Sequence, residues 1–183
     1  MKQTAGSRTL NMVYIALFAV VMAICSWIVI PMTVPFTLQT FGVFLAVLLL
    51  GGKRGTLAVA LYLLMGAVGL PVFSGFTGGI GVLLGYTGGY IAGFLLLALT
   101  MWFFEALFGK SAYIRWISMV LGLVLCYAFG TIWYVRVYAH SVGEIGVAAV
   151  FSFCVLPFVI PDIIKMMLAM AVRKRLAKAI KSL

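Results

Sequence analysis

The stretch Val159-Ile-Pro-Asp-Ile-Ile-Lys-Met-Met-Leu168 places an aspartate and a lysine inside an otherwise apolar segment. A charged side chain at the centre of a membrane helix costs about 2.5–3.5 kcal/mol on insertion scales, so such residues usually face protein or water. Asp162 and Lys165 are three residues apart, which places both on one face of a helix. Either they form a structural ion pair, or they face a polar ligand.

The rest of the chain has the composition of a membrane protein. Of its 183 residues, 66% are apolar and 9% are charged, and the mean hydropathy is +1.26. A soluble domain of this length cannot cover so much apolar surface. We therefore predict an all-α integral membrane protein, with residues 1–183 forming one membrane domain in the lipid bilayer.

Six apolar segments are predicted to cross the membrane as a six-helix bundle, since a span needs about 20 apolar residues. They cover residues 10–31, 36–51, 55–71, 87–108, 113–137 and 161–180. The last is predicted to begin at Pro161, which places Asp162 in a first helical turn, where a carboxylate complements the helix dipole. Residues 144–158 are predicted to form a half-buried helix before it, and the alternative is one long kinked span.

Positive charge lies almost entirely on one side of this topology. Six spans put both termini on one side, and the other side receives only Arg136. Basic loops stay in the cytoplasm, so both termini are predicted to be cytoplasmic at the cell (plasma) membrane. The net charge is +10, but the basic residues gather in short loops between apolar segments, which argues against nucleic acid as a partner. The C-terminal basic cluster can contact anionic lipid. The basic residues on the side of the termini are Lys2, Arg8, Lys53, Arg54, Lys110, Arg115, Arg173, Lys174, Arg175, Lys178 and Lys181.

Uncharged loops on the opposite side predict a ligand pocket. Residues 71–89 contain seven glycines, three aromatic residues and no charge. Non-helical backbone near a membrane must line a cavity or be covered by protein. We therefore expect a lid or pocket wall that includes Phe73, Gly79 and Gly89, and the alternative is a flexible connector.

Polar and aromatic residues begin the second and fourth predicted spans, next to these loops. Buried amides and hydroxyls need hydrogen-bond partners, and tyrosines also suit the membrane interface. The same residues can instead line a pocket and hold a small ring. The residues concerned are Thr37, Gln39, Thr40, Tyr86, Thr87 and Tyr90.

Few residues suit catalysis or metal binding. The chain has one histidine, His140, and its cysteines Cys25, Cys126 and Cys154 match no zinc or redox spacing, so we interpret them as buried apolar residues. No nucleophile elbow and no acidic pair is present in the sequence. We therefore predict a protein that is not an enzyme and that uses no metal or cofactor, with Glu105 paired to a nearby base.

A stripe of small residues, Ala16, Ala19 and Ala23, lies along the first predicted span. Small residues let two membrane helices approach closely. By itself this motif leaves open whether the stripe packs within the chain or against another membrane subunit.

Five stretches, in chain order, resemble the biotin-specific substrate-binding subunits of energy-coupling-factor (ECF) vitamin transporters. The resemblance implies a six-helix bundle that binds biotin from the outside, with a membrane coupling (T) subunit and two cytoplasmic ATPases as partners. It also implies that the alanines of the first span dock on the coupling subunit. The stretches are Val34-Pro-Phe-Thr-Leu-Gln-Thr-Phe-Gly-Val-Phe44, Gly51-Gly-Lys-Arg-Gly-Thr-Leu-Ala58, Gly66-Ala-Val-Gly-Leu-Pro-Val-Phe73, Gly85-Tyr-Thr-Gly-Gly-Tyr-Ile-Ala-Gly-Phe94 and Leu156-Pro-Phe-Val-Ile-Pro-Asp-Ile-Ile-Lys165.

The chemistry of biotin suits the candidate residues. Its ureido group has two N–H donors and one C=O acceptor, and its valerate chain ends in a carboxylate. Asp162 can accept a ureido N–H, while Lys165 can donate to the ureido oxygen or pair with the valerate. The apolar ring system is expected to pack against Phe36, Phe73, Tyr86 and Tyr90.

Three other functions stay open from the sequence. The chain can be a subunit for another vitamin, although Lys165 disfavours a cationic ligand such as thiamine. It can be a proton-coupled carrier that works alone, with Asp162 as the titrating group. It can also be an assembly protein that binds no small molecule.

Overall fold

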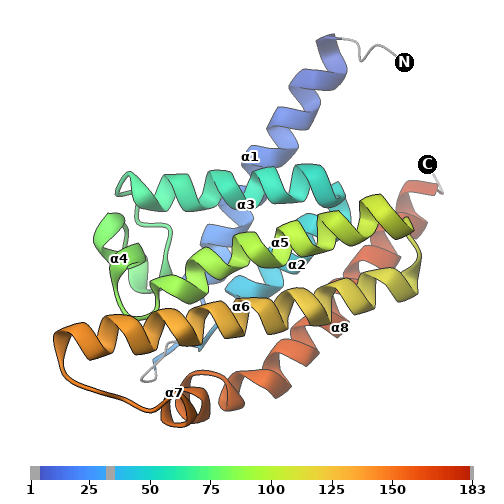
Figure 1. Cartoon of the computed structure of the whole chain (residues 1–183). Helices are drawn as coiled ribbons and strands as arrows, with labels where there is room; N and C mark the ends of the chain where they lie inside the picture. The colour runs from blue at the N-terminus through green and yellow to red at the C-terminus, as the bar shows by residue number, and fades with distance from the viewer. Residues whose placement is uncertain (1–4, 32–35, 182–183) are drawn as a thin grey trace.

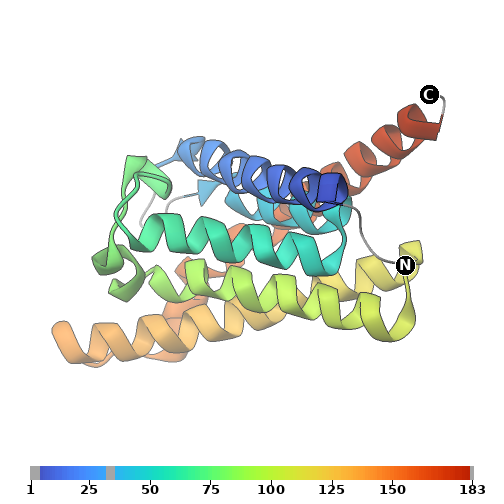
Figure 2. The ribbon, with the colours of Figure 1, turned by 90° about the horizontal axis from the view of Figure 1, so that it is seen from above.

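The chain folds into a bundle of helices that run back and forth between two ends, with the first and the last helix crossing the others at an angle (Figures 1 and 2). This computed structural model describes residues 5–31 and 36–181, with side chains over residues 8–31 and 36–176. A two-stranded antiparallel sheet pairs Val29 with Thr37 and Ile30 with Phe36. The elements are α1 (Ala5–Trp27), β1 (Val29–Ile30), β2 (Phe36–Thr37), α2 (Gln39–Leu50), α3 (Gly52–Ala67), the 3₁₀ turn η1 (Ser74–Phe76), α4 (Ile80–Leu84), α5 (Gly88–Phe108), α6 (Ala112–Ser141), α7 (Val147–Cys154) and α8 (Leu156–Lys181).

Each of the six predicted apolar segments coincides with a helix: α1, α2, α3, α5, α6 and α8. Among the described residues, α1, α5 and α6 are long and apolar enough to cross a membrane, and the bent pair α7–α8 makes a fourth candidate. Helices α2 and α3 have 12 and 16 residues, fewer than the about 20 that a full span needs.

The start of the last helix differs from the prediction. α8 begins at Leu156 rather than at Pro161, so Asp162 lies in its second turn and not in its first. The break falls at Val155, where α7 and α8 meet at 42°. Pro157 is tolerated there because the first turn of a helix lacks intrahelical acceptors for its N–H groups. The region is therefore closer to the alternative of one long, bent segment.

The two ends of the bundle carry different elements. Both termini, the α2–α3 junction and the α5–α6 turn lie at one end, whereas the β1–β2 hairpin, α4 and α7 lie at the other (Figures 1 and 2). The predicted basic residues on α3, α6 and α8 therefore gather at the end of the termini. Lys2 and the side chains of Lys178 and Lys181 lie outside the described part of the chain, as do residues 32–35 of the first uncharged loop.

Glu105 joins three elements at the end of the termini. Its carboxylate accepts the backbone N–H of Gly52 at 3.0 Å and pairs with Lys110 at 3.3 Å. The contacts hold the end of α5 against the start of α3, and they confirm the predicted pairing of Glu105 with a nearby base.

The stripe on α1 packs mostly inside the chain. Ala19 and Ala23 are buried in the core, where α1 contacts α2 and α3, while Ala16 is exposed. A surface for a partner subunit must be accessible. Neighbouring helices of the same chain cover Ala19 and Ala23, and the implied docking role of the stripe stays a prediction.

Helices α5 and α6 approach closely because glycines line their contact. Gly89 and Gly93, one turn apart on α5, face α6, while Gly122 and Gly130 on α6 face α5. A side chain at any of these positions would meet the opposing helix. The glycine spacing on α5 therefore serves packing within the chain.

We expect Gly93→Ala to destabilise the bundle. The added Cβ would lie 2.8 Å from the sulfur and 3.2 Å from the Cα of Cys126, and relieving such overpacking costs about 1–3 kcal/mol. Gly81→Ala is the matched control, since Gly81 is also helical and has open space around it. Thermal unfolding in detergent should give a lower melting temperature for Gly93→Ala only. Equal melting temperatures would contradict the close α5–α6 contact.

Candidate ligand pocket

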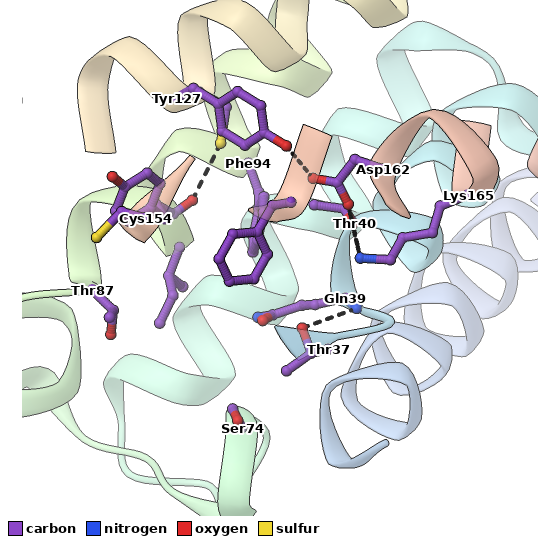
Figure 3. Close-up of a pocket in the computed structure, with 14 residues that line it drawn as sticks. Thr37, Gln39, Thr40, Ser74, Thr87, Phe94, Tyr127, Cys154, Asp162 and Lys165 are labelled. Atoms are coloured by element: carbon purple, nitrogen blue, oxygen red, sulfur yellow. Dashed lines mark hydrogen bonds and ion pairs between the residues drawn. The ribbon is translucent and has the colours of Figure 1, made fainter. Parts of the chain in front are cut away.

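A pocket lies among α2, α5, α6, α7 and α8 (Figure 3). Part of its lining comes from β2, η1 and the start of α5, elements at the end of the bundle that carries the hairpin and α4 (Figure 1). Its cavity volume is about 100 Å³. Its lining residues are Thr37, Gln39, Thr40, Ser74, Thr87, Tyr90, Ile91, Phe94, Cys126, Tyr127, Cys154, Phe158, Asp162 and Lys165.

The polar edge of the pocket is a buried ion pair. Lys165 Nζ donates to Asp162 Oδ1 at 2.8 Å, and only 4% and 2% of these two residues is exposed. The hydroxyl of Thr40 donates to the same oxygen at 2.8 Å and accepts from Lys165 at 3.0 Å. Tyr127 donates its hydroxyl to Asp162 Oδ2 (Figure 3). Residues from α2, α6 and α8 thus converge on one carboxylate.

This cluster keeps some hydrogen-bonding capacity for a ligand. Oδ1 of Asp162 accepts two bonds, whereas Oδ2 accepts one and has a second lone pair. Lys165 uses two of its three N–H groups, and its Nζ lies 4.3 Å from the centre of the Phe36 ring. The pocket therefore offers one strong acceptor and one cationic donor side by side.

A second hydrogen-bond chain orients the start of α2. The Gln39 side-chain amide donates to the hydroxyl of Tyr62, which donates to the backbone oxygen of Val72 at 3.0 Å. Ser26 of α1 also donates to the Val72 oxygen, at 2.6 Å. This chain anchors the segment after α3 to α1 and α2, beneath the pocket.

Aromatic residues form much of the remaining wall. Phe94 and Tyr90 come from α5, and the Tyr90 hydroxyl bonds to Thr131 of α6 at 3.0 Å. Phe158 of α8 lines the pocket and stacks on Phe36 with ring centres 6.1 Å apart. An apolar ring system can pack between such faces while its polar atoms reach the ion pair.

The structure brings most of the predicted ligand residues together. Phe36 does not line the pocket, but its ring covers Lys165. Thr40, which the sequence marks as polar among apolar neighbours, binds both charges. The predicted residues that line the pocket are Thr37, Gln39, Thr87, Tyr90, Asp162 and Lys165.

Four predicted residues lie elsewhere. Phe73 is buried in the core with its ring edge-on to Tyr62, because it fills the space beside Gly66. Tyr86 packs against Tyr134 and Tyr138 of α6. Neither ring lines the pocket, and both are engaged within the chain, so their predicted contact with a ligand stays a prediction.

Gly79 and Gly89 also lie outside the pocket lining. Gly79 precedes α4 with φ +99°, a backbone geometry that favours glycine, and its N–H bonds to Gly66. Gly89 faces Trp133 across the α5–α6 contact. Both glycines shape the backbone around the pocket rather than its surface.

The glycine-rich stretch 71–89 forms part of the pocket wall. Its Ser74 and Thr87 line the pocket. Trp27 anchors this stretch, because its indole N–H donates to the Pro71 oxygen at 2.9 Å and its ring stacks on Phe76. The prediction of a wall is therefore confirmed at two residues, whereas its role as a lid stays a prediction.

Several lining residues were not predicted from the sequence. Ile91 and Phe94 lie four and seven residues after Thr87, and Phe158 precedes Asp162 by one turn, so helical periodicity was an available signal. Tyr127, Cys126 and Cys154 had no such signal, because only the tertiary fold places α6 and α7 here. All three cysteines are free and buried, as predicted.

Both the sequence and the fold of the chain match known proteins. The BioY family profile matches residues 1–182. A protein named biotin transporter BioY from Thermotoga maritima is 42% identical over 165 residues, which cover 88% of this chain and 92% of that protein. A probable biotin transporter BioY from Pyrococcus horikoshii is 41% identical over 143 residues, covering 78% of this chain and 80% of its own.

A solved structure has the same fold. It is the crystal structure of the S-component for biotin from an ECF-type ABC transporter, with a TM-score of 0.82 and 28% identity. The alignment covers 97% of this chain and 95% of that one.

We expect the charges of Asp162 and Lys165 to stabilise the fold only as a pair. Lys165→Met or Asp162→Asn alone leaves one buried charge uncompensated, at a cost of about 3–5 kcal/mol. The double variant Asp162→Asn/Lys165→Met removes both charges, so its melting temperature in detergent should exceed that of either single variant. If the melting temperature of the double variant fell by the sum of the two single decreases, the two charges would not be coupled and the prediction would be contradicted.

Proposed function

Because the chain belongs to the BioY family, we propose that it is the biotin-binding membrane subunit, or S component, of an ATP-driven ECF-type uptake transporter. The family is one of transporters, and the chain is a membrane protein and not an enzyme. The observation that carries the proposal is the buried Asp162–Lys165 pair at the edge of an aromatic pocket.

The unused hydrogen-bond donor and acceptor positions of the Asp162–Lys165 pair suit the ureido group of biotin. A ureido N–H would donate to the second lone pair of Asp162 Oδ2. The third N–H of Lys165 would donate to the ureido oxygen or to the valerate carboxylate. Tight binding is expected because the ring system is buried between aromatic faces and these donors and acceptors all form hydrogen bonds. A hydrogen bond left unmade in a site without water is costly.

The placement of the pocket supports capture of biotin from outside the cell. The pocket lies toward the end opposite the termini, and the basic residues gather at the end of the termini. By the positive-inside rule, the basic end faces the cytoplasm. We place the chain in the plasma membrane with six membrane-crossing helices, both termini inside, and the pocket opening outward.

The energy for uptake must come from other subunits. The sequence contains no complete phosphate loop for a nucleotide, because Gly109-Lys110-Ser111 has Phe104 where the motif requires its first glycine. In our proposal the biotin-loaded chain associates with a membrane coupling (T) subunit, which joins it to two cytoplasmic ATPases. Exposed Ala16 stays a candidate for this contact.

We expect purified protein to bind biotin with sub-micromolar affinity in isothermal titration. Asp162→Asn removes an anionic acceptor and should weaken binding by about 1–3 kcal/mol. Glu105→Gln is the control. It neutralises a half-buried acid at the end of the bundle away from the pocket. The melting temperature of each variant establishes that folded protein is compared. No biotin binding by the unmodified chain would refute the proposal, and equal affinity in Asp162→Asn would limit the pair to a structural role.

A second measurement separates this function from a proton-coupled carrier. In vesicles that contain only this chain, a pH gradient is expected not to drive biotin uptake, because Asp162 stays paired. Uptake that follows the gradient would instead favour the carrier.

A further inference from the structure

An apolar groove runs along the surface between α6 and α8, with α7 at one end. Only two of its lining residues, Tyr127 and Thr131, carry polar side chains, and their hydroxyls bond inside the bundle to Asp162 and Tyr90. The groove therefore presents almost only carbon atoms to its surroundings. It is lined by Val120, Leu123, Val124, Tyr127, Ala128, Thr131, Ile132, Val147, Phe151, Val155, Val159, Ile163 and Met166.

A second hollow continues along the same two helices toward the end of the termini. It is lined by Ala112, Trp116, Met170, Ala171, Arg173 and Lys174. Trp116 lies one turn before Val120 on α6, and Met170 lies one turn after Met166 on α8. The two hollows thus form one continuous path, apolar over its length and basic at one end.

The basic end has unused positive charge. Arg173 is half-buried and Lys174 is exposed, and within the described residues neither forms an ion pair with an acid. The chain has only three acidic residues. Glu105 pairs with Lys110, Asp162 pairs with Lys165, and the third acid, Glu144, lies between α6 and α7 at the opposite end.

From this geometry we infer that the α6–α8 groove is a binding site for one anionic phospholipid. An acyl chain lies along the apolar groove, and the phosphate group meets Arg173 and Lys174. Trp116 lies at the junction, where aromatic residues with a polar tip favour the membrane interface. Basic pockets between membrane helices on the cytoplasmic side suit anionic lipid headgroups. The inference does not rest on biotin binding.

The dimensions of the path agree with this occupant. From Trp116 to Thr131 it follows α6 over a rise of about 22 Å, at 1.5 Å per residue. Half of a bilayer's hydrocarbon core is about 15 Å thick. One acyl chain can therefore lie along the path while its headgroup stays at the basic end. Helix α6 is itself a candidate membrane span, so lipid is the solvent that this face meets.

We would test the headgroup site with the delipidated full chain in detergent. Phosphatidylglycerol should raise the melting temperature more than phosphatidylcholine with the same acyl chains, and native mass spectrometry should retain one bound lipid. The variant Arg173→Gln/Lys174→Gln should weaken the phosphatidylglycerol affinity at least tenfold. Lys53→Gln/Arg54→Gln is the matched control, because it removes the same charge from the same end of the bundle on α3. Equal weakening in both variants would indicate diffuse attraction and would overturn the inference.

The groove itself has a separate test. Ala128→Trp would fill the groove and should abolish stabilisation by phosphatidylglycerol, although both cations remain. Leu125→Trp is its control, since Leu125 is exposed on the same helix outside the groove. Melting temperatures without lipid show that both variants fold. If Ala128→Trp binds the lipid normally, or if glycerol 3-phosphate stabilises the chain as well as the lipid does, the site is not a phospholipid groove.

Discussion

The buried ion pair of Asp162 and Lys165 is the interaction on which the arrangement of the pocket depends. Charges in an apolar segment must be compensated, because each uncompensated ion costs several kcal/mol. Thr40 from α2 and Tyr127 from α6 supply the missing hydrogen bonds. This requirement draws three helices to one point, and the pocket forms beside it. The same pair that holds the helices together is also the polar edge available to biotin.

Close packing around glycine sets the other side of the pocket. Gly89 and Gly93 let α5 approach α6, and this contact carries Tyr90 and Phe94 to the pocket wall. Where α6 and α8 leave an apolar groove instead, the membrane can fill the gap. The contrast explains why one face of α6 is sealed by protein while another is open to lipid.

Much of the fold was predictable because its signals are local. The length of the apolar segments predicted the six helices, and the placement of charge predicted that both termini lie on one side. The ribbon has both termini at one end of the bundle (Figure 2). The orientation of the chain in the membrane stays a prediction. The start of α8 was not predictable in this way, because Pro157 and Pro161 each suit the first turn of a helix, and the sequence does not say which of them the helix starts near. The positions of Phe73, Tyr86 and Ala19 away from the pocket lining or the surface were not predictable either, since aromatic or small character does not say which neighbour a side chain meets.

Hydropathy, loop charge and helical spacing are properties of the amino-acid chain alone, and they are enough to predict a helical membrane protein with an acid and a base on one helical face. The resemblance of its motifs added biotin to that picture. Three features come from the packing of the helices instead: Thr40 and Tyr127 complete the ion pair, Phe73 fills the core, and α6 and α8 leave a groove. Those outcomes depend on contacts between residues distant in sequence, for which the spacing along one helix carries no information.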